Sequence, residues 1–362
     1  MAESADRNVA KGRGATRSDV SQRFGLAVRE MDGDWRDARC AIDGEAPALR
    51  TQVTEERAKS ILTFNRSPDV PFDRSVNAYR GCEHGCVYCF ARPSHAFHDL
   101  SPGLDFETKL FAKPQAAELL RATLAKPTYA VRPIAIGTNT DPYQPIERRY
   151  RISRAVLELM VETRHPICVT TKSDRVLDDL DLLVDLARDG LTAVAISVTT
   201  LDPALARIME PRAAHPSRRL KAVETLVAKG VPTYVNIAPI IPAITDHEIE
   251  AITQAAASAG AKGVSAIPLR LPHELAPLFR DWLDVHYPDR AARVMRIVGE
   301  LRGGKDNDPA FFARMRGKGP WAELLRTRMD IARRRHGFVK GKFDLRCDLF
   351  RRPEIDGQLR LI

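Results

Sequence analysis

From about Val76 the chain alternates short apolar runs with longer stretches in which apolar residues recur every three or four positions. The short runs predict strands, and the longer stretches predict amphipathic helices. Such an alternation builds right-handed βαβ units, so we expect an α/β fold with a parallel sheet and a site at the carboxyl ends of its strands. The expected strands span 76–79, 131–137, 166–171, 192–200, 232–240 and 263–269, and the expected helices between them span 114–125, 153–164, 174–190, 216–230 and 246–260.

The two ends of the chain follow different patterns. Residues 1–60 are polar and turn-rich, which predicts a flexible N-terminal arm. After Leu271, four amphipathic stretches predict a helical region that ends near residue 338. We therefore divide the chain into an arm (1–60), a core (61–271) and a basic helical C-terminal extension (272–362).

Charge singles out the extension. The chain has 56 Lys and Arg residues against 47 Asp and Glu residues, a net charge of +9. Residues 270–362 contain 21 basic and 13 acidic residues, so nearly all of the excess lies there. A local basic excess indicates a polyanionic partner, most often nucleic acid, although a solvated helical face would give the same count.

The remaining composition is that of an ordinary soluble protein. With 362 residues, 44% hydrophobic and 28% charged, the chain is long enough for one barrel-sized domain with appendages. No apolar run has the length of a membrane span, and the first residues lack the apolar core of a signal peptide. We expect a cytoplasmic protein without membrane contact, in the compartment that keeps thiols reduced.

Three cysteines carry the most specific chemistry of the sequence. Cys82, Cys86 and Cys89 have the spacing C-x3-C-x2-C, and Tyr88 directly precedes the last of them. Three thiolates fit three corners of a [4Fe–4S] cube and leave one iron open, where the amine and carboxylate of S-adenosylmethionine could chelate. With an aromatic residue before the third cysteine, the motif resembles the signature of the radical S-adenosylmethionine (radical SAM) superfamily.

The alternative is a zinc site. Structural zinc is usually four-coordinate, and His84 or His95 could supply the fourth ligand. A second C-x2-C pair is missing, because Cys40, Cys168 and Cys347 are isolated in the sequence. A disulfide framework is a weaker alternative, since the cysteines are sparse and no secretory segment is expected. The spacing therefore favours the cluster.

Polar residues at the ends of the predicted strands are candidates for binding the cofactor. Lys172 follows the third strand and could pair with a carboxylate. Ser197 lies near the end of the fourth strand, and Asn236 interrupts the apolar fifth strand, where it needs a hydrogen-bond partner in the cofactor or on a neighbouring strand. Glu210 could meet the substrate or pair with Arg212. The loop after the second strand adds Thr138, Asn139, Thr140 and Asp141.

Together these segments resemble the spore photoproduct lyase-like, "DNA repair photolyase" group of the superfamily. The resemblance rests on YRGCEHGCVYCFARP, GTNTDPYQPIE, TKSD, SVTTLD and VNIAPIIPAITD, and it covers roughly residues 60–270. It implies a partial (β/α)6 TIM-like barrel, a [4Fe–4S] cluster on the three cysteines and a bound S-adenosylmethionine. It also implies that Tyr88 lies near the adenine, that Lys172 and Ser197 contact the cofactor, and that a low-potential electron donor is a partner.

One departure from this group concerns the return of a hydrogen atom to the product. Spore photoproduct lyase uses a further cysteine near the second strand, whereas IAIGTNTD contains none. The nearby Tyr143, a distant cysteine or different chemistry would have to replace it. The substrate is therefore open: a nucleic acid held by the basic extension, or a protein or small molecule. A non-enzymatic zinc module is the remaining alternative.

Overall fold

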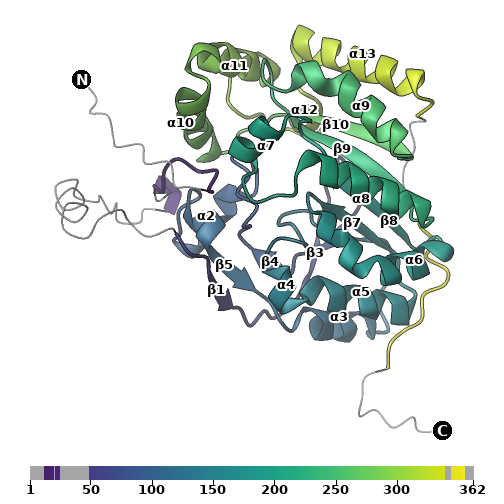
Figure 1. The fold of residues 1–362 in the computed structure, drawn as a ribbon. Helices are drawn as coiled ribbons and strands as arrows, with labels where there is room; N and C mark the ends of the chain where they lie inside the picture. Colours follow the sequence, from purple (N-terminus) through teal and green to yellow (C-terminus); the bar gives the residue numbers. More distant parts are fainter. Residues whose placement is uncertain (1–11, 20, 25–48, 339–343, 355–362) are drawn as a thin grey trace, which may run out of the picture.

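The computed structural model describes residues 12–19, 21–24, 49–338 and 344–354. In these ranges the chain forms one large sheet, an outer layer of helices and a second, small sheet (Figure 1). None of the helices there is both long enough and apolar enough to cross a lipid bilayer.

The large sheet has seven strands in the order β10-β9-β8-β7-β6-β3-β2. Six of them pair in parallel, and β2 (Leu62–Phe64) runs antiparallel at one edge. Each strand predicted from the sequence overlaps one of these parallel strands, which confirms the α/β class and the open (β/α)6 arrangement. The parallel strands are β3 (Arg74–Val76), β6 (Ile134–Ile136), β7 (Ile167–Thr171), β8 (Thr192–Ser197), β9 (Thr233–Ile240) and β10 (Gly263–Pro268).

The two faces of the sheet differ in side-chain size. Val169, Ile196 and Val235 belong to the main hydrophobic core together with residues of the outer helices. Side chains alternate along a strand, so Ala193, Ala195 and other small residues face the opposite, inner side. Small inner side chains leave room within the open barrel. The outer helices are α3 (Ala116–Leu124), α5 (Ile152–Thr163), α6 (Leu180–Arg188), α8 (Pro216–Ala228) and α9 (Ile249–Ser258).

A small sheet outside the barrel is not expected from the sequence, apart from Tyr79 of β4, which is the last residue of the predicted strand 76–79. It has the order β1-β5-β4, with β1 (Gln52–Glu55) parallel to β5 (Lys109–Ala112) and β4 (Tyr79–Arg80) antiparallel to it. Its strands are short and mixed in character, which gives little periodicity to detect. Short elements join the two sheets to the helical layer: η1 (Gln22–Phe24), η2 (Arg92–His98), α2 (Asp105–Thr108), α4 (Glu147–Tyr150), η3 (Asp174–Asp179), α7 (Pro203–Met209) and η4 (Asp246–Glu248).

The described part of residues 1–60 differs from the predicted flexible arm. Strand β1 is paired with β5, and residues 13–16 are buried against the body of the domain. The physical reason is specific polar contact instead of apolar periodicity: the Arg13 guanidinium donates to the carbonyl of Glu107 at 2.9 Å. Hydropathy alone does not reveal such contacts.

The C-terminal helices pack onto the barrel. Trp282 of α10 shares a hydrophobic cluster with the cysteine loop, and Leu325 and Met329 of α13 join the main core. Figure 1 shows α13 beside α9 on the outer layer, whereas α12 lies near β10. The predicted helical region is thus observed, as α10 (Leu275–His286), α11 (Pro288–Leu301), α12 (Ala313–Arg316) and α13 (Gly319–Arg335).

Candidate functional site

The three motif cysteines lie on one compact loop that follows β4. All three are free thiols; Cys82 and Cys86 are buried and Cys89 is half-buried. The amide of Cys82 donates to the carbonyl of Phe106 at 2.9 Å, and the amide of Cys89 donates to that of Cys86 at 3.2 Å. Burial raises the pKa of the Cys82 and Cys86 thiols well above the ordinary value. Thiolates at this site therefore need a compensating positive charge, which iron would supply.

The arrangement of the thiols fits a multi-iron cluster. Cys82 packs with Ala91 and Phe106, Cys86 belongs to a second apolar cluster, and Cys89 contacts both. In a cubane each iron corner takes its own thiolate, so three free thiols on one loop are a donor set that suits it.

Both histidines considered as zinc ligands have other neighbours. The Nδ1 atom of His84 lies 3.3 Å from a carboxylate oxygen of Asp141. The Nε2 atom of His95 lies 2.8 Å from the carbonyl oxygen of Lys109, and burial lowers the pKa of His95 to about 4. Both rings are thus built into the frame around the loop.

The buried guanidinium of Arg92 is hydrogen-bonded to the backbone of the cysteine loop. Arg92 is fully buried; its Nε donates to the carbonyl of Cys86 at 2.9 Å and its Nη2 to that of Gly85 at 3.1 Å. It also pairs with Glu107, whose carboxylate accepts the amide of Gly14 at 3.0 Å. The only sequence signal for Arg92 is a charge three residues after the motif, and sequence reasoning missed it.

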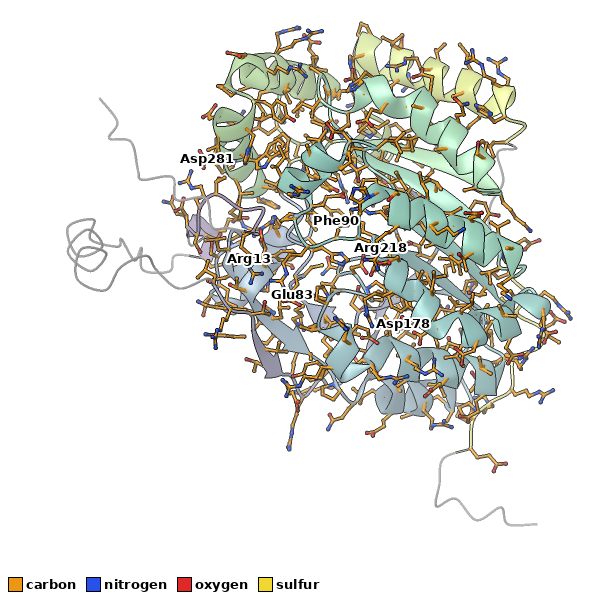
Figure 2. All side chains as sticks on the ribbon, viewed as in Figure 1. Arg13, Glu83, Phe90, Asp178, Arg218 and Asp281 are labelled. Carbon is orange, nitrogen blue, oxygen red and sulfur yellow. The ribbon has the colours of Figure 1, made fainter. Side chains whose placement is uncertain are left out.

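The N-terminal segment approaches the same loop closely. A Cβ atom on Gly14 would overlap the carbonyl oxygen of Gly85. Arg13 also donates to Thr51 at 3.2 Å, and Thr51 bonds to Glu83 of the cysteine loop. Figure 2 shows Arg13 and Glu83 on the same side of the molecule. This segment therefore forms part of the wall around the cysteines.

Asp141 joins three segments at the carboxyl ends of the strands. Its carboxylate accepts the Thr171 hydroxyl and the Lys172 amide, each at 2.7 Å, and faces His84 of the cysteine loop. Burial would raise the pKa of Asp141, but the neighbouring His84 and these hydrogen bonds lower it to about 2. The carboxylate is thus ionised and occupied by protein groups, which ties the loop after β6 to the end of β7.

The other polar residues of this loop face the strand that leads into the cysteines. The Thr138 hydroxyl and the Asn139 amide approach Oδ1 of Asn77 at 3.4 and 3.1 Å, and the Thr140 hydroxyl donates to the carbonyl of Tyr79 at 3.1 Å. Through these hydrogen bonds the GTNTD segment supports the backbone that leads into the cysteine loop.

Tyr143, the candidate hydrogen donor, lies in the main hydrophobic core and not with the cysteines. Its hydroxyl donates to Asp179 at 3.0 Å, because the turn at Asp141 directs the ring toward the outer helices. The next residue, Gln144, makes the contact that sequence reasoning missed. Its side chain accepts a hydrogen bond from the amide of Glu83 at 2.9 Å and donates one to the carbonyl of Gly81 at 3.2 Å. Gln144 therefore fixes the start of the cysteine loop.

Lys172 reaches the site from the end of β7. Its Nζ lies 5.7 Å from the centre of the Tyr88 ring and 4.0 Å from Glu210. Burial lowers the pKa of Lys172, whereas the neighbouring Cys86 raises it. The Tyr88 hydroxyl lies 3.2 Å from that of Thr199, which donates to Glu210 at 2.7 Å. A half-buried ammonium, an aromatic ring and the cysteines thus meet at one place.

Glu210 is paired with Arg219, and not with Arg212 as considered from the sequence. Both Glu210 and Arg219 are buried, and Arg219 also donates to the carbonyl of Ser197 at 3.1 Å. Arg212 instead lies 3.2 Å from Glu83 at the surface of the cysteine loop. Arg212 is closer to Glu210 in the sequence, but helix α8 packs so that Arg219 lies next to the end of β8.

Ser197 and Asn236 lie opposite each other on β8 and β9. The Ser265 hydroxyl donates to Oδ1 of Asn236 at 2.6 Å, so a neighbouring strand provides the partner that the sequence left open. The Ser197 hydroxyl makes no hydrogen bond with the residues that the structure describes. Both side chains therefore line the inner face next to the end of β7.

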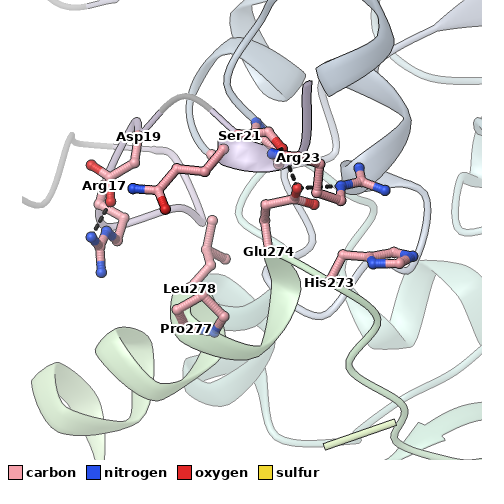
Figure 3. Close-up of a pocket in the computed structure, with 11 residues that line it drawn as sticks. Arg17, Asp19, Ser21, Arg23, His273, Glu274, Pro277 and Leu278 are labelled. Carbon is pink, nitrogen blue, oxygen red and sulfur yellow. Dashed lines mark hydrogen bonds and ion pairs between the residues drawn. The ribbon is translucent and has the colours of Figure 1, made fainter. Parts of the chain in front are cut away.

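A separate hollow of about 380 Å³ lies between the segment around η1 and α10 (Figure 3). Glu274 pairs with Arg23 at its edge, and Arg17 pairs with Asp281 nearby. None of the candidate site residues lines it, so it is distinct from the cysteine site.

Comparisons with known proteins agree with this arrangement. The sequence model described as "Radical SAM superfamily" matches residues 76–256. An uncharacterized protein of Mycobacterium tuberculosis is 35% identical over 248 residues, covering 67% of this chain and 72% of that protein. An uncharacterized protein of Methanocaldococcus jannaschii is 25% identical over 199 residues, 55% of this chain and 71% of its own length.

Solved structures of spore photoproduct lyase share the fold. One variant of that enzyme covers 86% of this chain and 85% of its own, with a TM-score of 0.58 at 14% identity. The lyase complexed with dinucleoside spore photoproduct covers 78% and 79%, with a TM-score of 0.57 at 13% identity. The likeness confirms the partial barrel expected from the sequence.

Proposed function

Because the chain belongs to the radical SAM superfamily, we propose that it binds a [4Fe–4S] cluster through Cys82, Cys86 and Cys89 and uses S-adenosylmethionine as its second cofactor. When bound, this pair would supply radical chemistry, in which one electron from a low-potential donor would cleave S-adenosylmethionine to methionine and a 5′-deoxyadenosyl radical able to take a hydrogen atom from the substrate. The observation that carries the proposal is the meeting of three free thiols with the half-buried Lys172 ammonium at the strand ends.

The chain's own residues would bind and orient S-adenosylmethionine. The Lys172 ammonium, 4.0 Å from Glu210, is placed to pair with the carboxylate of S-adenosylmethionine. Tyr88 offers a ring beside it for the adenine, and the hydroxyl of Ser197 and the amide of Asn236 offer hydrogen bonds on the inner face. Burial of Cys82 and Cys86 keeps water from the reactive centre.

For the substrate we propose a nucleic acid. Two observations support this choice: the fold is shared with spore photoproduct lyase, one structure of which holds a dinucleoside, and the excess positive charge lies in the C-terminal extension. The departure from that enzyme remains, because the loop after β6 carries no cysteine. The reaction therefore need not be the lyase reaction itself.

The test is anaerobic reconstitution followed by chemical analysis. We expect about four irons with matching sulfide per chain, and 5′-deoxyadenosine after reduction in the presence of S-adenosylmethionine. One zinc per chain, or a fully loaded cluster without 5′-deoxyadenosine, would contradict the proposal. Deuterium transfer from a labelled oligonucleotide into 5′-deoxyadenosine would identify a nucleic acid substrate, whereas turnover that ignores nucleic acid would exclude it.

A further inference from the structure

A guanidinium that forms no ion pair with the described residues lies next to the cysteine loop. Arg270 follows β10, and its guanidinium carbon lies 4.3 Å from the centre of the Phe90 ring. Phe90 is the residue that follows Cys89 in the sequence. The Arg270 side chain is half-buried, and among the described residues no carboxylate lies within ion-pair distance of it and no hydrogen-bond acceptor is recorded for it. Burial and the nearby Arg314 lower the pKa of Arg270, whereas Cys89 and Asp69 raise it. Charges that leave water are normally paired, so this position calls for an anion.

The neighbouring arginines show that the lack of a partner is specific to Arg270. Arg302 is buried and donates to four carbonyl oxygens, including those of Leu269 at 2.7 Å and Ala313 at 2.9 Å. Arg314 pairs with Asp69. The Nη atoms of Arg302 and the guanidinium of Arg314 thus have acceptors supplied by the fold, whereas the described residues offer none to Arg270.

Two exposed aromatic residues, Phe311 and Phe312, lie next to Arg314 and Arg316. Phe311 and Phe312 are 55% and 50% exposed, and Arg314 and Arg316 lie over their rings at 5.0 and 5.8 Å. Phe312 has a φ of 63°, which costs a bulky residue free energy, and its amide donates to Asp69. Large apolar side chains held in water beside cationic groups are typical of surfaces on which bases stack.

The position of these residues relates them to the cysteines. Segment 311–316 lies beside β10, and Asp69 connects it to the loop before β3. Phe90 and Glu83 lie near the middle of the view in Figure 2, between the C-terminal helices and α3 to α5. The basic helix α13 is instead packed on α9, where Arg328 pairs with Glu250. Within the basic extension, α10 thus packs against the cysteine loop through Trp282, and segment 311–316 lies beside β10.

We propose that Arg270 and Phe90, with Phe311 and Phe312, form the recognition surface for a single-stranded nucleic acid, in which Arg270 binds a backbone phosphate and the phenylalanine rings stack on unpaired bases. This inference rests on the function proposed above and names its substrate-binding residues. An arginine fork matches a phosphate, and ring stacking tolerates any base, so the surface selects strand form more than sequence. Because Phe90 adjoins Cys89, a strand bound here would lie next to the cluster.

Fluorescence anisotropy of a labelled oligothymidylate on the cluster-loaded protein tests the arginine. We expect Arg270→Gln to weaken binding about tenfold or more, and Arg270→Lys to give an intermediate loss. Arg293→Gln is the matched control, since Arg293 is exposed on α11 and the substitution removes the same charge. Equal losses for Arg270→Gln and Arg293→Gln would mean that only net charge matters, and would overturn the proposal. Iron content and circular dichroism establish that each variant is folded.

The double variant Phe311→Ala with Phe312→Ala tests the stacking. We expect it to weaken oligothymidylate binding about tenfold while leaving the binding of inorganic polyphosphate, which has no bases, unchanged. Equal effects on both ligands, no effect on either, or tighter binding of polyglutamate than of oligothymidylate would overturn a nucleic acid ligand.

These outcomes can be separated from those of the proposed function. The binding assay needs neither reductant nor turnover. Wild-type protein that loads its cluster but forms no 5′-deoxyadenosine would contradict the proposed function. It would not change what the binding assay shows about Arg270. Oligothymidylate binding that ignores Arg270, in protein that does form 5′-deoxyadenosine, would contradict this inference alone.

Discussion

Arg219 and Glu210 form a fully buried ion pair beneath the cysteine loop. Glu210 also accepts the Thr199 hydroxyl, and Arg219 also donates to the carbonyls of Ser197 and Ala214. The pair therefore connects α8, the end of β8 and the residue that contacts Tyr88. Breaking it would leave a charge in the interior, with an effect on both stability and the site.

We expect Arg219→Gln to lower the free energy of unfolding by about 3–5 kcal/mol, because it leaves Glu210 buried without its partner. Arg296→Gln is the matched control, since Arg296 pairs with Glu300 on α11 and both side chains are exposed, by 64% and 50%. It should cost less than about 1 kcal/mol. Urea denaturation of both variants measures the difference, and similar losses would contradict the assignment of Arg219 as the partner.

Glu147 predicts a pH dependence of stability. Burial raises the pKa of Glu147 to about 7, although hydrogen bonds from Tyr79 and from the Ser153 amide lower it. An unfolded Glu loses its proton near its ordinary pKa, so the folded state holds the extra proton between about pH 4.5 and 7. Over this range the stability of the wild type should fall as the pH rises, by up to about 3 kcal/mol.

The variant Glu147→Gln removes this titration and keeps the side-chain shape. Its stability should therefore change less with pH than that of the wild type, with the gap between them closing below about pH 4.5. Urea denaturation at a series of pH values measures both curves. Parallel curves would show that Glu147 does not titrate in this range.

Gly14 predicts how tightly the N-terminal segment encloses the cysteine loop. A Cβ atom there would overlap the carbonyl of Gly85, so Gly14→Ala should displace the segment or the loop and lower stability by about 1–3 kcal/mol. Gly299 of α11 has open space around it, and Gly299→Ala should be neutral or stabilising. We also expect faster loss of iron in air from the Gly14 variant. Equal iron loss in both variants would contradict the enclosing role.

The cysteines predict a clear division in iron content. Replacement of Cys82, Cys86 or Cys89 by Ser should abolish the iron and sulfide of the reconstituted protein. Cys168→Ser and Cys347→Ser should retain them, since Cys168 lies near the opposite end of β7 and Cys347 in the C-terminal segment. Iron that survives loss of a motif cysteine, or disappears with Cys168, would contradict the proposed ligand set.

Lys172 predicts a cofactor contact. Lys172→Met should weaken binding of S-adenosylmethionine to the cluster-loaded protein about tenfold or more, because the carboxylate loses its ammonium partner. Lys113→Met is the control: its ammonium donates to the carbonyl of Asn77 at 3.2 Å, as that of Lys172 does to Ala238 at 3.4 Å, but Lys113 faces Arg80 and Glu56 instead of the cysteines. Equilibrium dialysis with labelled S-adenosylmethionine compares the two. Equal losses would point to a general effect of buried charge.

The sequence by itself determined the sheet and the cysteine motif. Strand predictions rest on local sequence, and parallel strands of the barrel such as β7 and β8 lie in short stretches rich in apolar and β-branched residues, which can be recognised without knowledge of their neighbours. The same locality explains the failures: β1 and β5 are short and mixed, and residues 13–16 are buried through polar contacts that leave no periodicity.

Only the tertiary structure decided which polar side chains meet. It paired Glu210 with Arg219 instead of Arg212, occupied the Asp141 carboxylate with protein donors, and directed Tyr143 into the core. It also separated the basic extension into an outward helix and the segment beside β10. Hydrogen bonds and ion pairs act over a few ångströms between residues far apart in sequence, so their partners follow from the packing of the elements and not from spacing along the chain.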